Sequence, residues 1–319
     1  MERSLLFHRP LRQAPCLPSR NPTWPRPPRL GRSAGALLPL PILRVKCSAT
    51  YMESINHEIQ VHLEKALPIR QPLTVSKPMR GLTFSASRSV APALCVAACE
   101  LVGGDRARAI PTAAALHILH AWSYFRDHFP LSDGPMCKLE PTISHEFGTN
   151  IELLTGDGMV PFGIELISRS GGPGHDNPEQ NLRVIVEITR AIGSQGIIHG
   201  QYLQAKRGRT GEGEWDAGWV DTVREKKWGG LHGCAGACGA ILGGGGEWEI
   251  GKLRKYGAYV GMVRGMREGV GGDGGIDRKA MEEELRGKAV GELEGMMQQH
   301  GGKIGPIMTL LDDHANRDE

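Results

Sequence analysis

The stretch TAAALHILHAWSYF, residues 112–125, repeats apolar residues with the spacing of an α-helix. Pro111 comes directly before it, and proline is favoured in the first turn of a helix, where its missing N–H has no partner to lose. Pro130 follows, and a proline ends a helix because it cannot continue the backbone hydrogen bonding. We therefore expect an apolar helix that has Pro111 in its first turn and ends before Pro130.

The same spacing continues on both sides of this stretch. Upstream it recurs in residues 52–67 and 93–104, the second of which closes with Gly103-Gly104. Only VIVEI, residues 184–188, is compatible with a strand, and it lies within a longer amphipathic run that favours a helix. The further helical runs are residues 149–170, 178–193, 219–227, 249–269 and 277–299. The sequence therefore predicts one all-α domain.

Glycine-rich breaks separate several of these runs, at residues 171–174, 208–213, 243–246 and 271–275. A phosphate-binding loop needs a strand before it and a Lys-Ser/Thr pair after it, and none of the breaks has either. We interpret them as loops between helices.

Composition excludes little by itself. The chain has 319 residues, 40% of them apolar, which is enough for a buried core. Its formal net charge of +3 indicates neither nucleic acid nor an anionic membrane surface as a partner.

The N-terminal segment differs from the rest of the chain. Residues 1–48 contain one acid, Glu2, many prolines and a series of basic residues. The basic residues are Arg3, Arg9, Arg12, Arg20, Arg26, Arg29, Arg32, Arg44 and Lys46. We interpret residues 1–48 as a disordered organelle transit peptide and residues 49–319 as the all-α domain; an untargeted disordered tail is the alternative. The apolar piece at residues 35–43 is too short to span a membrane.

Seven cysteines in a chain without a secretory signal argue against a disulfide framework. Four of them form two C-x-x-x-C motifs, Cys95 with Cys99 and Cys234 with Cys238, each on one face of a helix. Alanines and glycines surround both motifs, which predicts a close helix–helix contact. Spacing alone does not separate a contact with a partner from a small-residue face inside the chain's own core. Zinc binding is disfavoured because neither pair has turn geometry.

Three histidines, His117, His120 and His128, lie near one another in sequence and invite a zinc-site reading. With no acid or cysteine suitably spaced in that helix, buried or partnered histidines are the favoured interpretation.

The stretch SYFRDHFPLSDGP, residues 123–135, resembles a carboxylate motif that has lost part of its carboxylates. Together with ALCVAACELVGGD, TGDGMVPFGIELI, GACGAILGGG and LRKYGAYVG, it resembles the plant trans-prenyl diphosphate synthases, from about residue 50 to near the end of the chain. FPLSDGP, ELLTGDGMVPFGIEL and the two cysteine motifs are similar to the small subunit of the heterodimeric geranyl or geranylgeranyl diphosphate synthases of plastids. The resemblance implies an isoprenoid-synthase-type helical bundle.

The aspartate motifs of that family are incomplete here. The first, D-D-x-x-x-x-D, falls on Asp127, His128 and Asp133, and MCKLE replaces the paired arginines that normally follow. The second, D-D-x-x-D, falls on residues 268–272 and keeps one carboxylate, Glu268. Condensation of isopentenyl diphosphate with an allylic diphosphate requires Mg²⁺ held by facing carboxylates. The resemblance therefore implies a remnant site without a metal.

The diphosphate-binding motifs are reduced as well. Arg88 stands at the family's lysine of G-G-K-R-x-R-P, and residues 89 and 91 lack its two arginines. Gln201 and Gln204 lie in the position of G-Q-x-x-D, and Lys227 keeps the lysine of the K-T pair.

The resemblance implies a non-catalytic small subunit in the plastid stroma. Its partner would be a catalytic geranylgeranyl diphosphate synthase, in a heterodimer or a larger complex, and Mg²⁺ is expected on that partner. The four motif cysteines are then expected at the subunit interface, and no catalytic residue on this chain. Two alternatives remain: an active short-chain prenyl diphosphate synthase with reduced motifs, and a zinc- or redox-responsive protein that uses the four cysteines.

Overall fold

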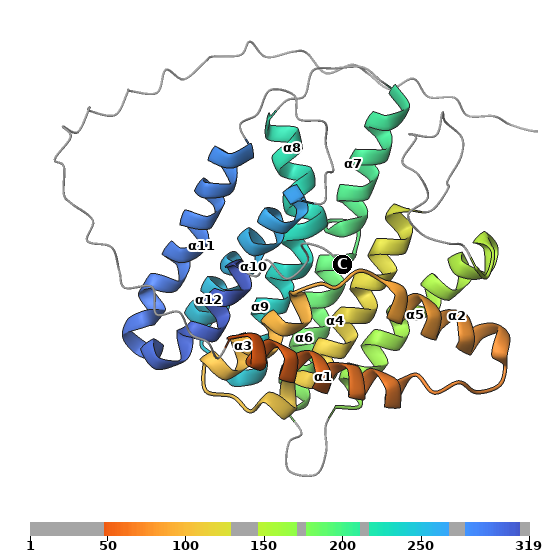
Figure 1. Cartoon of the computed structure of the whole chain (residues 1–319), viewed down its shortest axis with the longest axis horizontal. Coiled ribbons are helices and arrows are strands. Elements are labelled where there is room, and N and C mark those ends of the chain that lie inside the picture. Colours follow the sequence, from red (N-terminus) through yellow and green to blue (C-terminus); the bar gives the residue numbers. More distant parts are fainter. Residues whose placement is uncertain (1–47, 129–145, 171–176, 211–216, 268–277, 313–319) are drawn as a thin grey trace, which may run out of the picture. The chain divides into compact units, whose positions relative to one another are not determined.

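Helices make up nearly all of the chain that the computed structural model describes, which is residues 48–128, 146–170, 177–210, 217–267 and 278–312 (Figure 1). These residues contain no strand, so the predicted all-α class is confirmed. The α-helices are α1 (Ser48–Ala66), α2 (Leu73–Ser85), α3 (Ala91–Leu101), α4 (Arg106–Asp127), α5 (Thr149–Ser168), α6 (Pro178–Ile192), α7 (Ile197–Thr210), α8 (Ala217–Arg224), α9 (Gly230–Gly243), α10 (Glu247–Arg267), α11 (Arg278–His300) and α12 (Ile304–Asp312). A π-helical turn, η1 (Glu225–Gly229), joins α8 to α9, and a 3₁₀ turn, η2 (Gly301–Lys303), precedes α12.

The centre of the core is the contact between α3 and α9, which also pack against α4. Both helices are apolar around most of their circumference, and nearly every residue of each is buried. Glycines make the close approach possible: a Cβ added at Gly239 would lie 2.1 Å from the carbonyl oxygen of Cys95. On the other side of α9, a Cβ at Gly236 would lie 2.2 Å from the carbonyl oxygen of Leu253 on α10. Each glycine lowers the stability of a helix by about 1 kcal/mol relative to alanine. The dense packing of α3, α9 and α10 compensates for this loss of helix stability.

Helix α4 starts earlier than the sequence analysis predicted. Its first residue is Arg106, and the carboxylate of Asp105 accepts a hydrogen bond of 2.9 Å from the backbone N–H of Ala107, as an N-cap does. Pro111 therefore lies inside the helix and not in its first turn. The cap satisfies one of the free N–H groups at the helix start, so the helix extends five residues upstream of the proline.

Helix α1 packs its apolar residues Ile55, Ile59 and Leu63 into the core, and one arginine adds polar contacts to it. Arg106 forms ion pairs of 2.9 Å with Glu58 on α1 and 2.8 Å with Glu100 on α3. Tyr51, also on α1, donates a hydrogen bond to the same Glu100. The folded domain accordingly includes α1 from its first turns. The predicted transit peptide, apart from Ser48 at the first position of α1, lies outside the described residues.

The run VIVEI is helical, as predicted, and forms the middle of α6. Of the glycine-rich breaks, residues 243–246 form the turn between α9 and α10, with Gly244 at a φ of 81°. Residues 208–210 belong to α7, and the other predicted breaks lie outside the described residues. No described helix is both long and apolar enough to cross a membrane.

Candidate functional site

Three of the predicted remnant residues lie together where α4, α7 and η1 meet. Asp127 is the last residue of α4. Its Oδ1 accepts a hydrogen bond of 3.1 Å from Nε2 of Gln201 on α7, and its Oδ2 lies 3.0 Å from Nζ of Lys227 in η1. The same Nε2 lies 3.3 Å from the backbone carbonyl oxygen of Ser123. The carboxylate is thus bound by donors from two other elements.

Lys227 is the most buried member of this group, with 3% of its side chain exposed, against 26% for Asp127. Burying a charge is unfavourable unless the charge is paired and hydrogen-bonded. Besides Asp127, Nζ donates to Oε1 of Gln204 at 2.5 Å, and it lies 4.9 Å from the centre of the Trp228 ring. These contacts replace the interactions with water that the ammonium loses when it is buried.

Local backbone geometry brings Lys227 to this position. It lies in a five-residue π-helical turn, a geometry that is rare in proteins and frequent at functional sites. The facing residue of α7 is Gly200, where an added Cβ would lie 2.7 Å from Cγ of Lys227. The absence of a side chain at residue 200 lets η1 and α7 approach closely enough for Lys227 to reach Asp127.

The group does not fit a Mg²⁺ ion. Such an ion needs several oxygen ligands in near-octahedral geometry. The group of side chains around Lys227 consists of Asp127, Gln201, Gln204 and Lys227 in the described part of the chain. Asp127 is its one carboxylate, and both oxygens of Asp127 already have donors. The described residues contain no cluster of three or more His, Cys, Asp or Glu side chains that would hold a metal ion. Asp133 and Glu268, the other carboxylates of the remnant motifs, lie outside the described residues.

Arg88 is not part of this group. It is exposed in the connection between α2 and α3. The structure therefore brings together Asp127, Gln201 and Lys227 of the predicted remnant residues.

Each histidine considered for zinc has a backbone carbonyl as a partner. Nε2 of His117 lies 3.0 Å from the carbonyl oxygen of Thr83, and Nε2 of His120 lies 2.9 Å from that of Ser87. Nδ1 of His128 lies 2.7 Å from the carbonyl oxygen of Tyr124. Burial lowers the pKa of His120 to about 3, so that its ring is neutral at neutral pH. The interpretation of these histidines as partnered side chains is confirmed.

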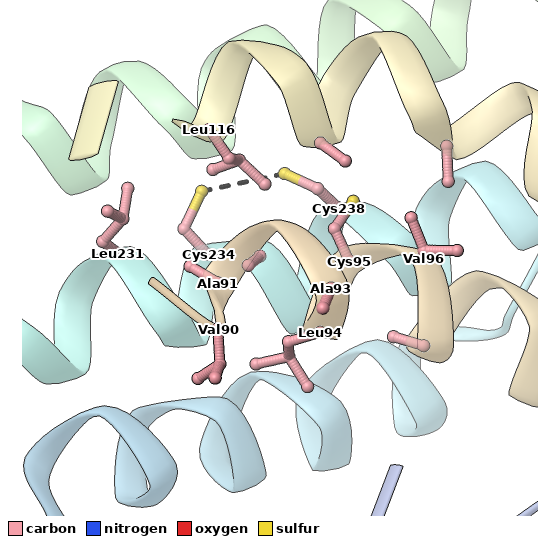
Figure 2. Close-up of a cluster of buried hydrophobic side chains, with 14 of the residues drawn as sticks. Val90, Ala91, Ala93, Leu94, Cys95, Val96, Leu116, Leu231, Cys234 and Cys238 are labelled. Carbon is pink, nitrogen blue, oxygen red and sulfur yellow. Dashed lines mark hydrogen bonds between the residues drawn. The ribbon is translucent and has the colours of Figure 1, made fainter. Parts of the chain in front are cut away.

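The four motif cysteines lie inside the chain's own core. Cys95 and Cys99 are on α3, Cys234 and Cys238 on α9, and each is buried. Figure 2 shows the sulfurs of Cys95, Cys234 and Cys238 among apolar side chains, with Leu116 of α4 beside them. Sγ of Cys234 lies 3.7 Å from Sγ of Cys238. The spacing left two alternatives open, a contact with a partner and a small-residue face inside the chain's own core. In the structure these sulfurs lie inside the chain's own core.

Burial also lowers the reactivity of three of these thiols, Cys95, Cys99 and Cys238. It raises the pKa of Cys99 to about 12 and that of Cys95 well above its usual value. For Cys238, the hydrogen bond with Cys234 raises the pKa first and burial adds to it. The thiolate is the form that attacks disulfides and binds metals. Neutral thiols therefore react slowly with disulfides and bind zinc poorly. The role of both motifs in partner recognition stays a prediction, and direct contact of the sulfurs with a partner would require the core to open.

A surface cavity of about 240 Å³ reaches the second cysteine motif from outside. It lies between α6, η1, α9 and α10, and Cys234 is part of its lining. The ion pair of 2.8 Å between Arg254 and Glu187 joins α10 to α6 beside it.

Sequence reasoning missed an apolar surface on two neighbouring helices, α5 and α6. Leu154 on α5 is 67% exposed and Leu182 on α6 is 62% exposed. Ile151 and Val186 on the same helices are also exposed. We call these four residues the α5–α6 surface. Its signal in the sequence is that residues 149–168 are apolar around most of the helix, although one face alone packs against α4.

The described residues form an all-α bundle in which the carboxylate at the end of α4 is paired to a buried lysine. Comparisons with known proteins agree. A chloroplastic heterodimeric geranylgeranyl pyrophosphate synthase small subunit 2 of Cannabis sativa is 44% identical over 266 residues, covering 82% of this chain and 91% of that protein. No family model matches the chain.

Solved structures give the same result. The geranyl diphosphate synthase small subunit of Antirrhinum majus is 47% identical, with a TM-score of 0.72 over 83% of this chain and 98% of that one. A chain of a mint heterotetrameric geranyl pyrophosphate synthase is 42% identical, with a TM-score of 0.71 over 82% of this chain and 99% of that one. The chain belongs to the family of small subunits of heterodimeric geranylgeranyl and geranyl diphosphate synthases. The predicted family and the isoprenoid-synthase-type bundle are confirmed.

Proposed function

We propose that this chain is a non-catalytic regulatory subunit of a plastid prenyltransferase. It binds a catalytic geranylgeranyl diphosphate synthase and changes that enzyme's activity or the length of its product, geranyl against geranylgeranyl diphosphate. The relatives are chloroplastic by name, which supports a plastid location, and we place the complex in the stroma.

The observation that carries the proposal is the state of Asp127 within an otherwise intact fold. Ionisation of an allylic diphosphate develops charge on the leaving group that metal ions stabilise. In this chain Asp127, the first carboxylate of the first motif, is bound to Lys227 and Gln201. Loss of one preorganised charge-stabilising contact typically costs a factor of about 10² in rate. We therefore infer that Mg²⁺ serves the catalytic partner and that this chain holds none.

The α5–α6 surface supports the second half of the proposal. Exposed large apolar side chains on a surface are a common feature of association sites, and the α5–α6 surface consists of four of them. The occupant that we assign is the catalytic subunit, since the relatives are subunits of heterodimeric enzymes. The two cysteine motifs would act on this association indirectly, by setting how closely α3 and α9 pack at the centre of the bundle.

A product assay tests the proposal. The purified chain is incubated with Mg²⁺, isopentenyl diphosphate and dimethylallyl diphosphate, alone and mixed with a plastid geranylgeranyl diphosphate synthase. The expected result is no product from the chain alone and, in the mixture, a rate or a ratio of C10 to C20 products that differs from that of the catalytic enzyme by itself.

The matched control is the Asp127→Asn variant. If the chain is an active synthase with reduced motifs, the chain alone makes product and Asp127→Asn abolishes it. That outcome would overturn the proposal. If neither the chain nor its variant turns over and both change the mixture equally, Asp127 has no catalytic role and the regulatory function stands.

A further inference from the structure

The ammonium of Lys227 lies beside the carboxylate of Asp127, where a metal ion would lie if the carboxylate bound one. This ammonium lies inside the bundle, within contact distance of a carboxylate at the end of α4, an amide on α7 and an aromatic ring in η1. Ammonium groups are almost never fully buried unless they are paired. The π-helical turn η1 and the absence of a side chain at Gly200 together allow one positive charge to reach Asp127.

We propose that the ε-ammonium of Lys227 is a built-in cation: it neutralises Asp127 at the position of the missing metal ion and holds α4, α7 and η1 together without a divalent ion. The proposal concerns the stability of the chain by itself and does not depend on the regulatory function.

Three contacts carry it. The distance of 3.0 Å from Nζ of Lys227 to Oδ2 of Asp127 is that of a direct ion pair. Oε1 of Gln204 accepts a second hydrogen bond from the same ammonium. Gln201 fixes the other oxygen of the carboxylate, so both oxygens of Asp127 point at protein donors. A divalent ion bound at this carboxylate would lie close to the ammonium, in a partly buried site where repulsion between like charges is strong.

The arrangement predicts how the chain responds to divalent ions. An ion that binds the folded state raises the unfolding temperature, and one that does not bind leaves it unchanged. We expect the Tm of the wild-type chain to be the same with Mg²⁺ as with a monovalent salt of equal ionic strength.

A double-mutant cycle on the full chain tests the pair. Asp127→Asn leaves the ammonium buried without its counter-ion, and Lys227→Met keeps an apolar side chain of similar length but removes the charge. Each single variant should lower the Tm by about 5 °C or more, because breaking a buried pair leaves an unpaired charge. The double variant should lose clearly less than the sum of the two.

The charge itself is tested by adding Mg²⁺ to each variant. Lys227→Met frees Oδ2 of Asp127 and Oε1 of Gln204, the two oxygens that face the ammonium, and Mg²⁺ can complete its ligands there with water. Mg²⁺ should therefore raise the Tm of this variant and should not raise that of the double variant. Lys226→Met is the matched control: Lys226 is the neighbouring residue, is half-buried and has no ion pair in the described part of the chain. Its Tm should stay near that of the wild type.

Three results would overturn the proposal. They are additive losses in the cycle, no Mg²⁺ response in Lys227→Met, or a wild-type Tm that rises with Mg²⁺ and ceases to do so in Asp127→Asn. If Lys227→Met does not fold, Asp127→Asn decides alone, since a built-in cation without its carboxylate must lower the Tm. A product assay is not needed for any of these results, so failure here leaves the regulatory function standing.

Discussion

At the scale of single residues, the cysteines show how far chemistry depends on surroundings. The two C-x-x-x-C motifs have the same spacing and small neighbours of different kinds, and Cys234 lines the surface cavity between α6, η1, α9 and α10. The pKa of each of its three companions is raised, by burial for Cys95 and Cys99 and by the hydrogen bond with Cys234 and then burial for Cys238.

We predict a graded reactivity of these thiols. With iodoacetamide at about pH 8, near the ordinary thiol pKa, Cys95, Cys99 and Cys238 should stay unmodified in the native chain, because each is a buried, neutral thiol. Cys234 should react first among the four. All four should react in guanidinium chloride, which serves as the control. Peptide mass spectrometry reads each site, and native labelling of Cys95 or Cys238 at the rate of Cys234 would contradict the buried arrangement.

The residues of the site were within reach of sequence reasoning, and their contacts were not. Asp127, Gln201 and Lys227 could be named from motif positions, because the resemblance places each one by its neighbours in the chain. The contact between Asp127 and Gln201 joins residues 74 positions apart. Neither spacing nor composition predicts that the two side chains meet, or that a π-helical turn brings the lysine to them.

At the scale of the elements, helical periodicity was enough to place most of the helices, because an apolar stripe needs a partner whatever its neighbours are. It failed at the start of α4, where one aspartate cap moved the boundary upstream of Pro111. The glycines of α9 were predicted to permit a close approach, but the sequence did not show that the approaching helices are α3 and α10.

We predict that this close packing is sensitive to a single methyl group. Gly239→Ala places a Cβ 2.1 Å from the carbonyl oxygen of Cys95, so α3 and α9 must separate. The free energy of unfolding should fall by about 3 kcal/mol, as in overpacked cores. The matched control is Gly291→Ala on α11, where an added Cβ meets nothing within 4 Å. This change should raise stability by up to about 1 kcal/mol through helix propensity.

Urea unfolding followed by circular dichroism measures both variants. A loss for Gly239→Ala no larger than that of an ordinary surface substitution, about 0.5 kcal/mol, would show that the two helices have room to spare.

At the scale of the whole molecule, the question is which surface meets a partner. Small residues and spacing left the cysteine motifs open between an interface and the chain's own core, and the resemblance implied the interface. In the described chain the two motifs face one another across α3 and α9, and their role in partner recognition stays a prediction. For residues 149–170 the sequence predicted a helix and did not say which of its faces would be buried. The structure packs α5 against α4, α2 and α6 and leaves Leu154 exposed, so this part of its apolar surface is open to another molecule.

We predict that charge on the α5–α6 surface separates association from folding. Leu154→Lys and Leu182→Lys change side chains that are 67% and 62% exposed, so the Tm of the chain alone should stay within about 2 °C of the wild type. In a complex each lysine would be desolvated without a counter-ion, so binding to the catalytic synthase should weaken at least about tenfold, as for a truncated interface anchor. Surface plasmon resonance measures the affinity, and Trp248→Lys, an exposed aromatic on α10, is the control that should bind normally. Unchanged affinity in both leucine variants would place the partner elsewhere. If Trp248→Lys alone weakened binding, the interface would lie on α10, and the exposed leucines would belong to a contact with another molecule.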